Sequence, residues 1–289
     1  MRSALLTAVL AIAAAPRAEA QTADDDFGPR PQTGDPCADA MLGAIAAPVR
    51  DSGFDRGHGA CLEGGLALRG RAAALSGGPV TDDTTTISGE LELRWLYLAD
   101  LELTVGARAV DHRLAGDSAV VDDDTQFGPV YLAAAAGRAT RAFDRPLRLS
   151  WSLRLDLPWT TTGDDGAPTL AASPQVAAAL RLGPHLAGHA RIGALLWLAN
   201  PPGGVDTRRA LALAADMTWA PWRRLAGAIG VEAQSGWHGF EIDHLLARGG
   251  LRVPIAGSVR LELAGAAPLV GRESELTDLV VELSLIAGR

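Results

Sequence analysis

The feature that most constrains this chain is a strict alternation of apolar and polar residues along most of its length. In the clearest run, from Leu147 to Trp159, every second residue is leucine or tryptophan, and most of the residues between them are charged or carry a hydroxyl. Successive side chains of a β-strand point to opposite faces, whereas a helix would spread these charges around its circumference. The run therefore predicts a strand with one apolar and one polar face.

About twelve such segments follow one another between residue 61 and residue 289, and the connections between them alternate in length. We expect tight connections near 98–100, 141–145, 183–184, 221–222 and 254–257, and long ones near 77–86, 113–126, 160–172, 200–207, 236–241 and 270–276. Short turns on one rim and long loops on the other are typical of a transmembrane β-barrel. The pattern predicts an all-β fold: a closed antiparallel up-and-down transmembrane β-barrel of about twelve strands, with both chain ends on the short-turn, periplasmic rim.

Alternation by itself does not decide which face of the strands meets water. In a soluble barrel the apolar row points inward, whereas in a membrane barrel it faces lipid and the charges line the lumen. Lipid is favoured because the apolar rows are almost free of charge, the strands exceed the usual ~5–6 residues, and aromatic residues stand near strand ends. These aromatic residues are Tyr97, Phe127, Tyr131, Trp159, Trp219 and Trp222. An exported soluble β protein is the alternative.

The first twenty residues have the pattern of a secretory signal peptide. Arg2 precedes an apolar stretch from residue 4 to residue 15, and residues 18–20 read Ala-Glu-Ala. A buried N-terminal helix is the alternative. Export to an oxidising compartment favours a structural disulfide between the two cysteines of the chain, Cys37 and Cys61.

Residues 21–60 then form a separate periplasmic segment ahead of the barrel, which covers 61–289. Apolar residues at helical spacing between 38 and 49 predict a short helix in this segment. They are Met41, Leu42, Ile45 and Val49. Alanines on several later strands leave room along one arc of the lumen, so the helix is a candidate plug that would dock on that arc. The alternative, which we favour, is a helix resting under the barrel or a loose tail.

The polar faces of the strands carry mixed charges, which we expect on the opposite arc of the lumen. The candidate pore-lining residues are Arg69, Arg71, Glu90, Glu92, Arg94, Glu102, Arg108, Arg148, Arg154, Asp156, Arg181, Arg191, Arg248, Arg252, Arg260, Glu262 and Glu282. The interpretation we favour is a network of ion pairs that braces the wall. The other is a ladder of arginines that guides anionic solutes, because the planar guanidinium suits carboxylate and phosphate.

On these alternating segments and connections, the chain from about residue 61 to residue 289 resembles the porin-like outer-membrane β-barrels of Gram-negative bacteria. The resemblance rests on the pattern and indicates no subfamily. It implies an outer-membrane location, with lipid and small solutes as partners. Such barrels commonly end on an aromatic residue, whereas this chain ends with the residues Leu-Ile-Ala-Gly-Arg at 285–289.

Composition narrows the function further. All 26 basic residues are arginine, which excludes chemistry that needs a lysine, and the net charge of −8 argues against a nucleic-acid partner. We expect no cofactor, no metal site and no enzymatic activity, and we interpret acidic stretches such as Asp122–Asp124 as solvated loops rather than calcium sites. The prediction is a passive channel for small solutes, with anionic solutes among the candidates. The alternatives are a non-conducting structural barrel and an outer-membrane hydrolase using His185 or His189.

Overall fold

The structure of the chain is a computed structural model. It describes residues 37, 40–45, 60–61, 66–77, 84–98, 101–114, 124–157, 170–199, 209–236, 242, 244–256, 259–270 and 279–287. The predicted signal peptide, the long loops and Val49 lie outside these residues. Within the described part, no helix is long and apolar enough to cross a membrane.

Twelve strands and one short 3-10 helix make up the described structure. The strands are β1 (Leu66–Gly77), β2 (Thr84–Leu98), β3 (Leu101–Leu114), β4 (Asp124–Ala142), β5 (Arg145–Leu157), β6 (Leu170–Gly183), β7 (Leu186–Ala199), β8 (Arg209–Trp222), β9 (Leu225–Gly236), β10 (His244–Ala256), β11 (Val259–Val270) and β12 (Leu279–Ala287). The 3-10 helix η2 covers Ala40–Leu42. Most strands have 12 to 15 residues.

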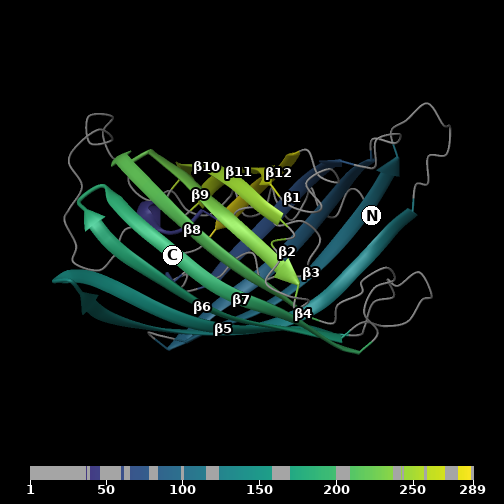
Figure 1. Ribbon diagram of the computed structural model, residues 1–289, viewed down its shortest axis with the longest axis horizontal. Coiled ribbons are helices and arrows are strands. Elements are labelled where there is room, and N and C mark those ends of the chain that lie inside the picture. Colours follow the sequence, from purple (N-terminus) through teal and green to yellow (C-terminus); the bar gives the residue numbers. More distant parts are fainter. Residues whose placement is uncertain are drawn as a thin grey trace.

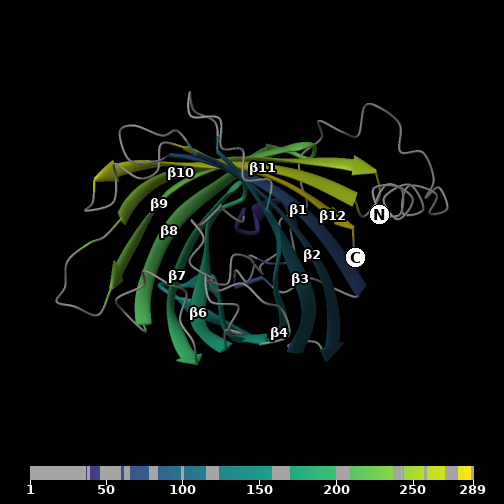
Figure 2. The ribbon, with the colours of Figure 1, turned by 90° about the vertical axis from the view of Figure 1, so that its right-hand side faces the viewer.

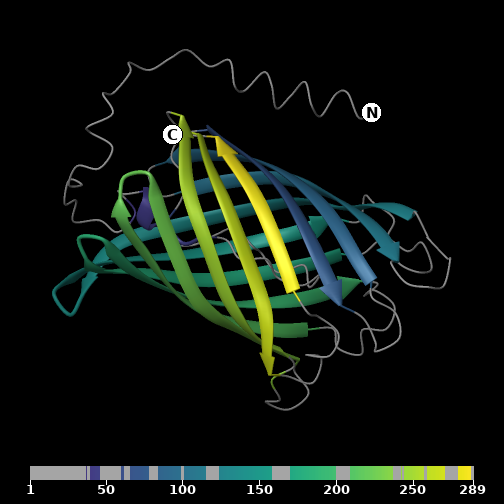
Figure 3. The same cartoon turned by 90° about the horizontal axis from the view of Figure 1, so that it is seen from above.

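Each strand pairs antiparallel with its neighbours in sequence, and the first strand also pairs with the last. Leu68 lies opposite Leu93 on β2 and opposite Ala287 on β12, so the sheet closes into a barrel. Figure 1 shows the strands following one another around the wall, and Figure 3 shows the yellow β12 beside the blue β1. The all-β, antiparallel up-and-down architecture predicted from the alternation is therefore confirmed.

The two faces of the wall differ as the sequence pattern requires. On β5, Trp151 and Leu153 are 53% and 45% exposed, whereas the intervening Ser152 and Arg154 are 7% and 4% exposed. The same arrangement continues around the barrel, with exposed side chains at Leu91, Leu93, Trp95, Leu103, Leu132, Leu213, Trp219, Ile229, Leu251 and Leu263. Apolar side chains point outward and charged side chains point into the lumen. This is the reverse of a soluble barrel.

At one rim of the barrel, only two residues separate β2 from β3, β4 from β5, β6 from β7, β8 from β9 and β10 from β11. Phe143 and Asp144 both have positive φ angles, 50° and 59°, as a type I′ hairpin turn requires. We call this side the tight-turn rim. Because β1 begins and β12 ends there, the N-terminal segment meets the barrel at this rim.

Candidate functional site in the barrel lumen

Most of the predicted pore-lining residues have side chains that are shut inside the barrel. Those that are buried are Glu90, Glu92, Arg94, Glu102, Arg154, Asp156, Arg181, Arg248, Arg252, Glu262 and Glu282, and those that are partly buried are Arg148, Arg191 and Arg260. The side chains of Arg69, Arg71 and Arg108 lie outside the described part of the structure. Burial of charge is costly unless each charge is paired. The partners of these charges therefore decide what the lumen can do.

One group of paired charges, the tyrosine cluster, lies on β2, β4 and β5. Its members are Glu90, Glu92, Arg94, Tyr131, Arg154 and Asp156. The hydroxyl of Tyr131 lies 2.5 Å from Oε1 of Glu90 and 2.7 Å from Oε1 of Glu92. Arg94 donates to Oε2 of Glu92 from two guanidinium nitrogens, at 2.8 and 3.1 Å. The phenol has one proton and can donate it to only one carboxylate at a time. Glu90 and Glu92 therefore share this donor, and Tyr131 links the two acids.

Arg154 completes the tyrosine cluster from the neighbouring strand. Its guanidinium stacks 3.6 Å from the centroid of the Tyr131 ring and donates to Oδ1 of Asp156 at 2.8 Å. The same group lies 3.8 Å from Oε1 of Glu90. Arginine over an aromatic face is a favourable cation–π arrangement, strongest where water is excluded. The cluster thus links three strands through paired charges, and its arginines do not form a ladder of positive charge.

Tyr131 corrects one prediction from the sequence. We expected it among the aromatic residues at the membrane interface, but its side chain is 1% exposed and points into the lumen. It lies opposite Gly106 on β3, where a Cβ atom would overlap the tyrosine ring. The glycine therefore makes room for the ring. We assigned Tyr131 to the membrane interface because it lies near a strand end. Its position in the alternation of β4, on the same side as the buried Ala133 and Ala135, predicts the lumen instead.

A second group, the Glu232 cluster, was not anticipated. Glu232 accepts hydrogen bonds from Arg191 at 2.7 Å, from Arg248 at 2.8 Å and from Gln234 at 3.0 Å. Arg248 also lies 3.6 Å from Asp216. These residues belong to β7, β8, β9 and β10, and the carboxylate of Glu232 is completely enclosed.

The Glu232 cluster changes the expected distribution of charge. The sequence predicted charges on one arc and alanines on the opposite arc, yet this cluster lies on β7 to β10, among the alanines. Asp216 and Glu232 are single acids in weakly alternating strands, and the registers of the consecutive strands β7 to β10 bring them to the arginines. In the sequence, both acids lie on the polar side of their strands, and this position could have identified them as lumen residues.

The cysteines form the predicted disulfide, with their Cα atoms 5.0 Å apart. The short helix η2 (Ala40–Leu42), close to Cys37 in the sequence, lies inside the barrel (Figure 2). The interpretation that we favoured from the sequence, a helix resting under the barrel or a loose tail, is therefore wrong for these residues. Leu42 is fully buried and packs with Met41 against Ala187, Ala220 and Ala226 of β7, β8 and β9. On the other side of the disulfide, Ala60 packs against Ala177 and Ala179 of β6. We call residues 40–45 the inner segment.

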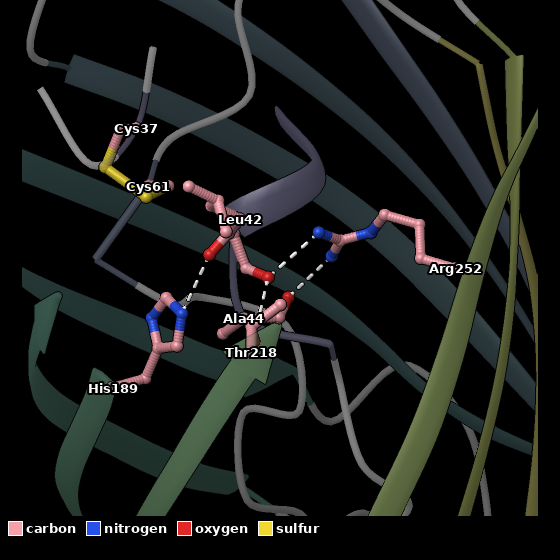
Figure 4. Close-up of a disulfide and its surroundings, with 8 residues drawn as sticks. Cys37, Leu42, Ala44, Cys61, His189, Thr218 and Arg252 are labelled. Atoms are coloured by element: carbon pink, nitrogen blue, oxygen red, sulfur yellow. Dashed lines mark hydrogen bonds between the residues drawn. A yellow bond between two sulfur atoms is a disulfide. The ribbon is translucent and has the colours of Figure 1, made fainter. Parts of the chain in front are cut away.

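The helix predicted from residue 38 to residue 49 is wrong for the residues described. Helical structure is limited to the 3-10 turn Ala40–Leu42, and Gly43 to Ile45 are not helical. The reason is competition for backbone carbonyls, which an α-helix needs for its own hydrogen bonds. Barrel side chains take these carbonyls instead, as Figure 4 shows.

Arg252 of β10 makes most of these bonds to the inner segment. Nη1 donates to the carbonyls of Met41 at 3.2 Å and Gly43 at 2.8 Å, and Nη2 donates to Ala44 at 2.8 Å. Its Nε and Nη2 also bond Oε1 of Glu262, at 2.7 and 2.6 Å. A guanidinium has five N–H donors, and these contacts use all of them. Arg252 thus binds both an acid of the wall and the inner segment.

Two further predicted residues have local roles. Arg181 donates to the carbonyls of Gly183 and Pro184 at 3.2 and 2.8 Å and so braces the turn between β6 and β7. His189, a candidate of the hydrolase alternative, bonds the Leu42 carbonyl through Nε2 at 2.9 Å. Because a carbonyl only accepts, Nε2 carries the proton. Among the described residues, His189 binds the inner segment.

Of the comparisons with known proteins, the one with solved structures supports the barrel fold. No family model matches the chain, and no curated protein matches it. The KdgM porin in complex with disordered oligogalacturonate superposes with a TM-score of 0.51 at 7% identity, over 77% of this chain and 99% of that one. The NanC porin gives a TM-score of 0.48 at 9% identity, over 78% and 99%. At such low identity the likeness concerns the fold. The chain has the porin-like fold of outer-membrane β-barrels.

Proposed function

We propose that this porin-like barrel spans the outer membrane and acts as a passive channel for small solutes. The observation that carries the proposal is the orientation of the wall, with leucine and tryptophan outside and paired charges inside. An outward apolar wall is stable in lipid, and a lumen lined by charges is stable when wet. The porin-like fold supports the same function, since the solved structures that share it include channels.

The orientation in the membrane follows from the connections between strands. We propose that the tight-turn rim faces the periplasm and the long connections face outward, as in bacterial barrels generally. Residues 1–20 would be the export signal, 21–60 a periplasmic segment and 61–289 the barrel. Both chain ends would then lie on the periplasmic side, where an oxidising environment maintains the disulfide.

The charges of the lumen support modest selectivity. Arg94, Arg154, Arg191, Arg248 and Arg252 each lie beside a carboxylate. Paired charges present weaker fields than unpaired ones, so strong anion selectivity is not expected. Arginine nevertheless binds carboxylates through two parallel hydrogen bonds, which favours small acidic solutes over cations.

Single-channel recording in planar bilayers tests the proposal. We expect discrete steps, even if rare, and a reversal potential that shows a mild preference for anions. Folding is checked beforehand by the migration of unheated protein on a denaturing gel. Folded protein that never produces a step would refute the channel.

One observation favours a second candidate, a structural barrel that does not conduct. The inner-wall charges are shielded from solvent, with Glu92, Arg94 and Arg252 each 2% exposed. A permanently braced lumen would have this property. The channel and the structural barrel differ in whether part of the lumen can move aside to open a path for solutes.

A further inference from the structure

The inner segment is bound to the lumen wall rather than loosely enclosed by it. Leu42 is fully buried, and the carbonyls of Met41 to Ala44 accept hydrogen bonds from side chains on three different strands. The donors are Arg252 on β10, His189 on β7 and Thr218 on β8. Contacts from three strands to four consecutive residues define a specific binding site for this segment.

The wall of the lumen is also shaped for the inner segment. Ile45 packs over Gly250, where an added Cβ would come within 2.8 Å of Cγ2 of Ile45. Ala187, Ala220 and Ala226 provide a shallow floor for Leu42. Larger side chains at these four positions would occupy the space of the segment. These small residues thus form the surface of the wall on which the inner segment packs.

We propose that the inner segment is a plug that closes the tight-turn end of the lumen, and that Arg252 is the latch that holds it. The disulfide Cys37–Cys61 ties the plug beside the barrel, since Ala60 and Cys61 pack on β6. Departure of the segment would free the three guanidinium donors that now bind its carbonyls. The same movement would therefore open the path and turn these donors, on a guanidinium still paired with Glu262, toward a passing carboxylate.

The chemistry of the latch identifies what competes with the plug. Neutral carbonyls hold the guanidinium less strongly than a carboxylate does, because charge-assisted hydrogen bonds are the stronger ones. A small carboxylic acid that reaches Arg252 would therefore displace the inner segment. The plug matters only in a barrel that conducts, so this inference rests on the proposed function.

Two matched pairs of variants in the full chain test the plug by single-channel recording. Arg252→Gln removes the latch, and its control Arg141→Gln removes an exposed guanidinium at the tight-turn rim, one that bonds the Asp144 carbonyl. Gly250→Ala crowds Ile45, and its control Gly249→Ala places a methyl group at an ordinary 3.7 Å from the Ala228 carbonyl oxygen. The second pair leaves all charges unchanged, so it remains informative if Arg252→Gln folds poorly.

We expect Arg252→Gln to raise the ratio of open to closed time about tenfold or more, because even one lost charge-assisted hydrogen bond shifts an equilibrium by about that factor. Gly250→Ala should also raise this ratio, because the added methyl group overlaps Ile45 and destabilises the bound segment. The two controls should keep the unmodified ratio. If all four variants conduct like the unmodified protein, the plug is refuted and the channel stands. If neither the unmodified protein nor any folded variant conducts, both proposals fail.

Discussion

At the scale of single residues, the lumen is organised by a few side chains that each serve several partners. Tyr131, Glu232 and Arg252 are the centres of three such groups. The sequence predicted that Arg252 faces inward, but not that its donors bind a segment more than 200 residues away. Which charge meets which depends on strand register and barrel closure, and neither is encoded locally.

The pairing of Gly106 with Tyr131 gives a prediction about stability. Gly106→Ala puts a Cβ into the space of the tyrosine ring, and such overpacking typically costs about 1–3 kcal/mol. In a Tyr131→Ala background the same change should be nearly neutral. Urea titration of the barrel folded in lipid vesicles measures both. Gly193→Ala is the control, since its nearest neighbour lies at an ordinary 3.6 Å. Equal losses in the two backgrounds would contradict the pairing.

Glu232 gives a second prediction at this scale. Glu232→Gln leaves Arg191 and Arg248 without the carboxylate that they share, and breaking a buried ion pair costs about 3–5 kcal/mol. Replacing Arg248 by methionine in the same chain should recover part of the loss, because it removes one of the two buried guanidinium groups that have lost this carboxylate. The free energies of unfolding of the unmodified chain, the single variant and the double variant test this prediction. A single variant as stable as the unmodified chain would show that Glu232 does not hold the cluster together.

At the scale of elements, the strands were the most predictable part of the molecule. The period-two pattern located β5 closely, because Leu147 to Leu157 alternates without interruption. The N-terminal helix failed for the opposite reason. Its spacing is helical, but Arg252 and His189 bind the carbonyls that a helix would use. A local sequence pattern predicts structure well where the backbone hydrogen-bonds within its own element or to an adjacent strand. It predicts structure poorly where side chains from distant residues bind the backbone carbonyls.

The turn between β4 and β5 carries a prediction of its own. Phe143 is almost fully exposed and has a φ of 50°, a left-handed conformation that costs most residues about 1–2 kcal/mol. Asparagine tolerates it better. Phe143→Asn should therefore raise the free energy of unfolding by about 1 kcal/mol. Phe143→Ala, which removes the ring and keeps the backbone cost, should not. A gain with alanine as large as that with asparagine would attribute the effect to the ring instead.

At the scale of the whole molecule, the outer wall should behave as a surface that meets lipid. Leu251 lies near the middle of β10 and Ile255 near its end, and both point outward. Arginine on a lipid-facing strand costs about 2–4 kcal/mol at the bilayer midplane and about 0–1 kcal/mol near the interface. Leu251→Arg should thus destabilise the barrel in vesicles much more than Ile255→Arg. Equal, small effects would indicate a wall in contact with water.

The central claim is that hydrocarbon surrounds the apolar wall, and tryptophan fluorescence in brominated lipid vesicles tests it most directly. Trp95, Trp151, Trp219 and Trp222 point outward, each at least 42% exposed. Bromine on the acyl chains should strongly quench the emission of the folded barrel relative to unbrominated vesicles. Emission unchanged by bromine, from protein that stays monomeric in buffer without detergent, would contradict the membrane barrel and the channel proposed from it.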